Sequence, residues 1–78
     1  MMTPLEKGTL EYRFRKALRE RFDSQQEASV RLGIPMHRIQ LACRGDLGKL
    51  TGDDFRRLSS VLPRTVQADL ARRLFPYA

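Results

Sequence analysis

Apolar residues return along this chain every three or four positions, which is the spacing of one buried face of an α-helix. The first clear stripe consists of Leu10, Phe14, Ala17 and Leu18. No segment alternates β-branched and polar residues, and no Asn-Gly or Asp-Gly pair is present to form a hairpin turn. The pattern therefore predicts an all-α protein.

The residues between the stripes are typical of helix ends. Thr9, Ser24 and Thr51 each precede a helical pattern and are expected N-caps. Gly33 is expected just after the end of one helix, and Pro35 at the first position of the next. The expected helices span about residues 10–22, 24–32, 35–44, 52–62 and 65–74.

A chain of 78 residues has room for a single domain, so we expect one compact bundle of four to five helices. Residues 1–9 are expected to form an N-terminal arm or a short helix. Residues 63–78 are expected to form a C-terminal helix and tail. Between them, residues 24–45 contain two short helices that meet at a tight turn.

The composition is basic. Fifteen Lys and Arg face nine Asp and Glu, which gives a net charge of +6, and 12 of the 15 cations are Arg. Arginine suits two-pronged contacts with phosphate, bases or carboxylates, although many solvated surfaces carry a similar charge. One cysteine, Cys43, excludes an intrachain disulfide and fits a cytoplasmic location. No apolar run approaches a membrane span, and the N-terminus lacks the apolar region of a signal peptide.

Residues 24–45 meet the requirements of a DNA-binding helix-turn-helix. Close crossing of its two helices needs a small residue within the first helix, which Ser29 provides. The turn needs a glycine, which is Gly33. Apolar anchors are needed on both sides of the turn, and they are Leu32, Ile34, Ile39 and Ala42.

The segment resembles the helix-turn-helix of the Cro and lambda-repressor-like (XRE-type) family of phage and bacterial regulators. The matching residues are Ser24-Gln25-Gln26-Glu27-Ala28-Ser29, then Leu32-Gly33-Ile34, Ile39 and Arg44-Gly45. The match covers 22 of the 78 residues, and the flanking helices fit the five-helix layout of the family. The resemblance implies a sequence-specific transcriptional regulator, typically a repressor, that binds palindromic double-stranded DNA as a homodimer.

The resemblance also implies which residues contact DNA. The third helix would enter the major groove, where Arg44 suits guanine and Gln40 suits adenine. The implied base-reading residues are Met36, His37, Gln40, Leu41 and Arg44. The implied phosphate contacts are Gln25, Arg31, Arg38 and Lys49. The basic face of the first helix adds further phosphate candidates, namely Arg13, Arg15, Lys16 and Arg19.

Some residues depart from the family pattern and leave an alternative open. Met36 and Leu41 are large apolar residues at positions that usually carry short polar ones, so an exposed Met36/Leu41 face would suit a protein-binding adaptor or inhibitor. The apolar residues of the tail, Leu74, Phe75 and Tyr77, either form the dimer contact or fold back on the core.

Catalytic and metal-binding signals are absent from the sequence. His37 is the only histidine, and one cysteine without spaced partners cannot complete a metal site. No nucleophile with a base and no phosphate-cradling glycine loop is present, so we expect neither an enzyme nor a cofactor. Asp53 and Asp54 resemble a carboxylate pair, but their place in a first helical turn favours helix capping.

Overall fold

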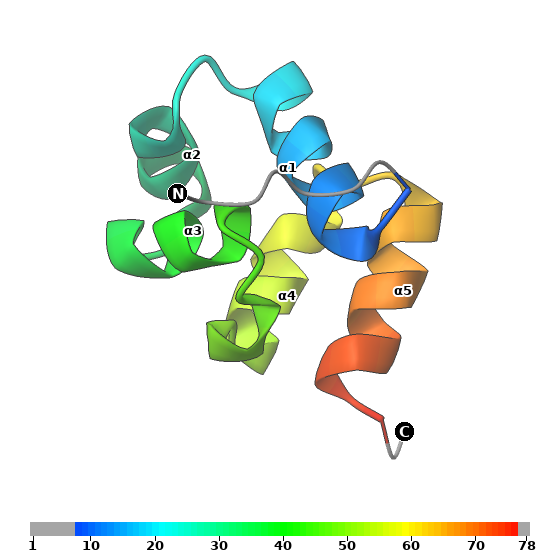
Figure 1. The fold of residues 1–78 in the computed structure, drawn as a ribbon. Helices are drawn as coiled ribbons and strands as arrows, with labels where there is room; N and C mark the ends of the chain where they lie inside the picture. Colours follow the sequence, from blue (N-terminus) through cyan, green and yellow to red (C-terminus); the bar gives the residue numbers. More distant parts are fainter. Residues whose placement is uncertain (1–7, 77–78) are drawn as a thin grey trace.

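A computed structural model describes residues 8–76 of the chain. This part contains helices and no strand, which confirms the all-α prediction (Figure 1). The elements are α1 (Leu10–Arg21), α2 (Gln25–Leu32), α3 (Met36–Cys43), the 3₁₀ turn η1 (Leu47–Lys49), α4 (Gly52–Ser59) and α5 (Arg64–Leu74).

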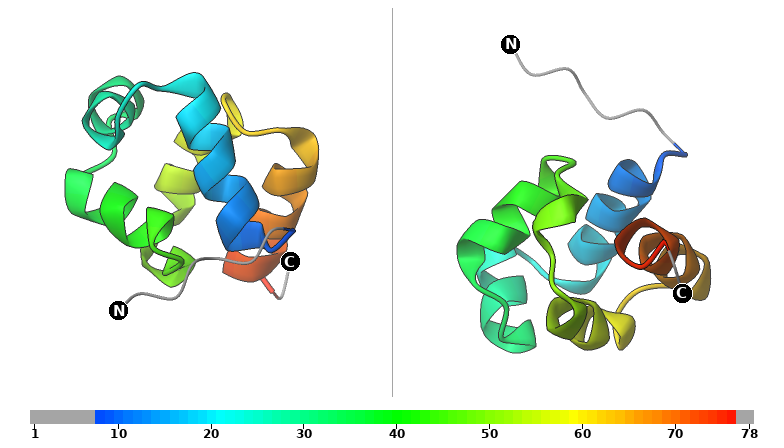
Figure 2. Two further views of the ribbon diagram at one scale, coloured as in Figure 1. Left: turned by 45° about the horizontal axis from the view of Figure 1, so that its top comes forward. Right: turned by 90° about the horizontal axis from the view of Figure 1, so that it is seen from below.

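Helix α1 lies at the centre of the bundle. It contacts α2 and α3 on one side and α5 on the other, so the α2–α3 pair and α5 occupy opposite ends of the molecule (Figures 1 and 2). Helix α4 packs against α5, and η1 packs against both α3 and α5. The α2–α3 pair therefore stands at one edge of the bundle with α1 behind it.

One hydrophobic core joins these elements. Phe14, Ile39, Leu58 and Leu70 are fully buried and come from four different helices. Burying a side chain of this size stabilises the fold by about 1.5–3 kcal/mol. The segment after α3 adds Leu47 and Leu50 to the core, although they lie between the expected helices 35–44 and 52–62.

The predicted N-caps are confirmed. The hydroxyl of Thr9 accepts from the backbone N–H of Tyr12 at 3.2 Å. Ser24 Oγ accepts from the N–H of Glu27 at 3.0 Å. The Glu27 carboxylate accepts from the N–H of Asp23, the residue before the cap, at 3.3 Å. Both bonds of a capping box form at α4, where Thr51 and Asp54 exchange hydrogen bonds of 3.1 Å.

The helix boundaries agree with the expected ones to within one residue, except at the end of α4. Pro35 is the N-cap of α3 and not its first residue. Helix α4 ends at Ser59, three residues before the expected Leu62. The proline at position 63 disfavours helical geometry at the preceding residue. The Gln67 side chain also donates to the carbonyls of Ser59 and Leu62, at 2.8 and 2.6 Å, and Pro63 has no N–H with which to bond the Ser59 carbonyl in a continued helix.

Candidate functional site

The turn between α2 and α3 is built around Gly33 and Ser29. Gly33 has φ of +72° and ψ of 26°, a left-handed conformation that glycine adopts without steric cost. Its N–H and that of Ile34 donate to the carbonyl of Ser29, at 2.9 and 3.2 Å. The Ser29 hydroxyl donates to the Ile34 carbonyl at 2.6 Å. Ser29 was predicted for its small size, and its hydrogen bonds also fasten the turn.

Arg57 of α4 holds the same turn from outside. Its Nη1 donates to the Leu32 carbonyl at 3.2 Å, and its Nε donates to Asp53 at 3.0 Å. The guanidinium thus satisfies a carbonyl at the end of α2, where such groups lack helical partners. This role of Arg57 could not be predicted from the sequence, because the local pattern shows only its four-residue spacing from Asp53.

Helix α3 has one buried and one exposed face. Ile39, Ala42 and Cys43 are buried, as predicted. The polar residues implied as base readers are all exposed, and they are His37, Gln40 and Arg44. The helix contains no acidic residue, so its exposed face repels no phosphate.

The two apolar residues of that set are less accessible than expected. Met36 and Leu41 are half-buried and not exposed. After α3 the chain turns back, and the backbone carbonyl of Leu41 accepts from the N–H of Asp46 at 2.9 Å. This removes much of the apolar surface on which the adaptor alternative depends.

Arg38 forms an internal ion pair. Its Nε lies 2.8 Å from Asp54 Oδ2, and its Nη2 donates to Asp54 Oδ1 at 3.2 Å. The Asp54 side chain is 2% exposed and that of Arg38 is 28% exposed. A buried carboxylate needs such a partner. Arg38, implied as a phosphate contact, therefore connects α3 to the start of α4.

Among the other implied phosphate contacts, Gln25 and Lys49 are exposed, and Arg31 forms a surface ion pair of 3.6 Å with Glu27. Exposed pairs of this kind are worth little and exchange partners readily. Within residues 8–76, six cationic side chains take part in no ion pair: Arg15, Arg19, Arg21, Arg44, Lys49 and Arg64. These unpaired side chains can therefore bind an anionic partner.

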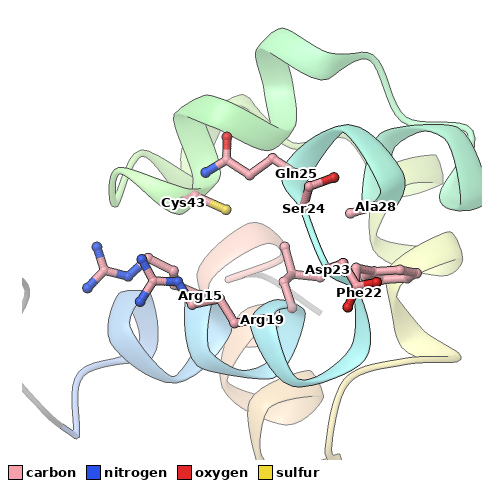
Figure 3. Close-up of a pocket in the computed structure, with 9 residues that line it drawn as sticks. Arg15, Arg19, Phe22, Asp23, Ser24, Gln25, Ala28 and Cys43 are labelled. Atoms are coloured by element: carbon pink, nitrogen blue, oxygen red, sulfur yellow. The ribbon is translucent and has the colours of Figure 1, made fainter.

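Three of these free cations gather at a hollow between α1, α2 and α3. A cavity of about 170 Å³ lies between α1 and the start of α2, with Arg15, Arg19 and Gln25 among its lining residues (Figure 3). A second hollow shares these three residues and extends to Gln40 and Arg44 of α3. Charged and amide groups from three helices therefore meet at the same edge of the molecule.

Cys43 lies at the boundary of both hollows, and Figure 3 shows its sulfur directed toward α1. Burial raises the pKa of the Cys43 thiol, and the nearby Arg15 and Arg19 lower it by less. The thiol is therefore protonated at neutral pH and behaves as part of the apolar lining.

Two of the three C-terminal residues implied as a dimer contact, Leu74 and Phe75, lie within the described residues. Leu74 is half-buried against the core, and Phe75, 40% exposed, places its ring at 84° to that of Phe55 with centroids 5.7 Å apart. Tyr77 lies outside the described residues. Leu74 and Phe75 therefore fold back on the bundle, and Phe75 keeps part of its ring exposed.

Residues 8–76 contain no group of three or more His, Cys, Asp or Glu side chains arranged to hold a metal ion. Over the same range, every helix is too short or too polar to cross a membrane.

Comparisons of the chain with protein-family models, with curated proteins and with solved structures found no match.

Proposed function

We propose that this protein binds double-stranded DNA through the α2–α3 helix-turn-helix, with α3 in the major groove. The observation that carries the proposal is the exposed polar face of α3, flanked by arginines from α1 that form no ion pair among the described residues. This edge of the molecule is polar and cationic, and α3 carries no acidic residue. Such a surface complements the major groove and the phosphate backbone of a DNA duplex.

Base contacts and phosphate contacts separate on this surface. Arg44 and Gln40 reach from exposed positions on α3 and suit the major-groove edges of guanine and adenine. Gln25 stands at the start of α2, where the helix dipole favours a phosphate. Arg15 and Arg19 extend the phosphate surface onto α1. In this proposal Arg38 holds α3 in place, because Asp54 occupies its guanidinium.

One helix-turn-helix covers half of a typical operator. We therefore propose that the protein acts as a homodimer on a palindromic site and serves as a transcriptional regulator of the repressor type. Among the described residues of the C-terminal segment, Phe75 is our candidate for the dimer contact, since part of its ring remains accessible.

The test is duplex binding measured by fluorescence anisotropy over a series of salt concentrations. The logarithm of the binding constant should fall linearly with the logarithm of salt. Arg15→Gln and Arg19→Gln should each weaken binding to every duplex and reduce the slope by about 1. Arg64→Gln is the matched control, because Arg64 is also exposed and unpaired in the described chain but lies away from α3. We expect it to bind like the wild type.

Failure to bind any duplex at low salt would overturn the proposal. In that event, a folded Leu41→Asp variant that loses binding to a protein partner would favour the adaptor alternative.

A further inference from the structure

We propose that the 170 Å³ cavity between α1 and α2 binds a small organic anion, consisting of one apolar ring or short chain with a single carboxylate. The ligand would regulate the protein by occupying groups that the proposed function assigns to DNA phosphate. The proposal that a ligand binds depends only on the cavity, whereas the proposal that it regulates the protein rests on the proposed function.

The inner lining of the cavity is apolar. Leu18 and Phe22 contribute from α1 and its end, Ala28 from α2 and Cys43 from α3, and each is less than a tenth exposed. These side chains already belong to the core, so they present a preformed surface for an apolar body. Such a surface gives a ligand apolar contacts at little ordering cost.

The rim of the cavity is cationic at one end. Arg15 and Arg19 line it from α1, one helical turn apart, and take part in no ion pair within residues 8–76. Gln25 adds an amide from the opposite side (Figure 3). Asp23 lines the cavity beside Phe22, at the end away from Arg15 (Figure 3). An anionic group is therefore directed to the arginine end, and the apolar body to the end near Phe22.

The size of the cavity limits the ligand. A dry protein cavity of about 150 Å³ admits one benzene ring, whereas drug-sized ligands need roughly 300–1,000 Å³. At about 170 Å³, this cavity has room for one ring or a chain of similar volume. The carboxylate would extend past the rim toward the guanidinium groups, where planar two-pronged contacts form.

Binding of such a ligand would oppose binding of DNA. Arg15, Arg19 and Gln25 line both this cavity and the hollow beside Arg44. A carboxylate bound there neutralises the arginines and places negative charge where a backbone phosphate would lie. The coupling is reciprocal, so a bound duplex should weaken the ligand to the same extent.

The first experiment titrates benzoate into the ¹⁵N,¹³C-labelled protein and follows its NMR signals. Benzoate should saturate and shift the signals of Ala28, Cys43 and Gln25. Benzamide, which lacks the charge, and acetate, which lacks the ring, should each bind at least about tenfold more weakly, which corresponds to about 1.4 kcal/mol. Equal binding of benzamide or of acetate would overturn the proposal. Inorganic phosphate binding as tightly as benzoate would also overturn it, since the hollow would then be a simple phosphate site.

The second experiment uses variants. Arg19→Gln should weaken benzoate by about tenfold and leave benzamide unchanged, because it removes a charge and leaves the apolar lining intact. Arg64→Gln should bind both probes like the wild type, and its amide spectrum, like that of Arg19→Gln, checks that the fold is kept. Unchanged benzoate binding by a folded Arg19→Gln would contradict the proposed site.

A third measurement separates the two proposals. Saturating benzoate should reduce duplex affinity of the wild type, while equal concentrations of benzamide should not. If no duplex binds but benzoate still does, the DNA proposal fails and the anion site stands. If duplex binding is normal and benzoate does not bind, the anion site fails alone.

Discussion

At Gly33 the backbone of the helix-turn-helix restricts the choice of side chain. Its φ of +72° costs an L-residue about 1–2 kcal/mol. An added Cβ would lie 2.7 Å from Arg57 Nη1, but that atom ends a flexible side chain and can move. We therefore expect Gly33→Ala to lower the free energy of unfolding by about 1–2 kcal/mol in urea denaturation, mainly because of its φ.

Two comparisons separate backbone strain from crowding. Gly48→Ala should change stability by less than about 0.5 kcal/mol, since φ at Gly48 is not positive and its nearest neighbour, Asp46 Oδ1, lies 3.7 Å from the added Cβ. Gly33→Ala should have the same effect in an Arg57→Gln background. A much smaller effect there would show that the contact with Arg57, and not φ, is the cause.

Asp54 is the residue whose charge matters most inside the bundle. Its carboxylate accepts from the Thr51 N–H and pairs with Arg38, and its side chain is 2% exposed. Asp54→Asn keeps a capping oxygen but removes the charge opposite a partly buried guanidinium. We expect a loss of about 2–3 kcal/mol in unfolding free energy, since breaking such a pair leaves the other charge uncompensated.

The matched control is Asp53→Asn on the same turn of α4. Asp53 is exposed and pairs with Arg56 and Arg57 at the surface, so Asp53→Asn should lower the free energy of unfolding much less than Asp54→Asn. Equal losses for the two variants would contradict the role assigned to the buried pair.

At the scale of the elements, the sequence was sufficient for most of the fold. Caps such as Thr9 and Thr51 and the turn residue Gly33 act on neighbours within a few positions, so a local pattern reveals them. The expected end of α4 lay three residues too late, although Pro63 is a local signal, because the apolar stripe continues to Leu62 and the contact of Gln67 with the Ser59 carbonyl cannot be read from a local pattern. The roles of Arg38 and Arg57 were missed for the same reason, since each side chain binds an element distant in sequence.

The candidate site was predictable in part. The helical period of α3 placed His37, Gln40 and Arg44 outward, where the structure has them exposed. The same period could not show that Leu41 is half-buried, nor that Arg15 and Arg19 of α1 meet Gln25 of α2 at a hollow. Both depend on how elements pack, and periodicity within one helix does not contain that information.

Helix α3 should determine which duplex is preferred. In a selection of bound duplexes from a random pool, Gln40→Ala should relax the preference at one base pair and lower affinity for the selected site by 1–3 kcal/mol, roughly the worth of a good base contact. Arg19→Gln should leave the selected sequence unchanged, because a phosphate contact carries no base information. If Arg19→Gln altered the selected sequence and Gln40→Ala did not, the proposed division of contacts would be wrong.

At the scale of the whole molecule, two ion pairs join α1 to α5. Arg13 pairs with Asp69, and Arg73 Nη1 lies 2.8 Å from Glu11 Oε1. The hydrogen bond from Arg13 is the main cause that lowers the pKa of Asp69, and Arg72 adds to it. The pKa of Glu11 is also lowered, first by its own backbone N–H and then by Arg73.

Because these carboxyl pKa values are lowered, the ion pairs between α1 and α5 should contribute less stability in acid. When a carboxyl pKa is lower in the folded state, the unfolded chain binds more protons, so stability rises with pH between the two values. The contribution should be complete above the ordinary values of 3.8 for Asp and 4.5 for Glu, and it should disappear as pH falls through the lowered ones. Urea unfolding from pH 2 to 7 should therefore give a plateau above about pH 5 and a decline below it.

Asp69→Asn tests whether the ion pairs between α1 and α5 cause this loss of stability in acid. The variant should be less stable than the wild type at pH 7 and should decline less steeply below pH 4, because one proton-linked group has been removed. Asp46→Asn is the control, since Asp46 is exposed and forms no ion pair within the described chain, and its profile should follow the wild type. An Asp69→Asn profile parallel to the wild type at every pH would place the acid sensitivity elsewhere, with Asp53 and its two arginines on α4 as the next group to test.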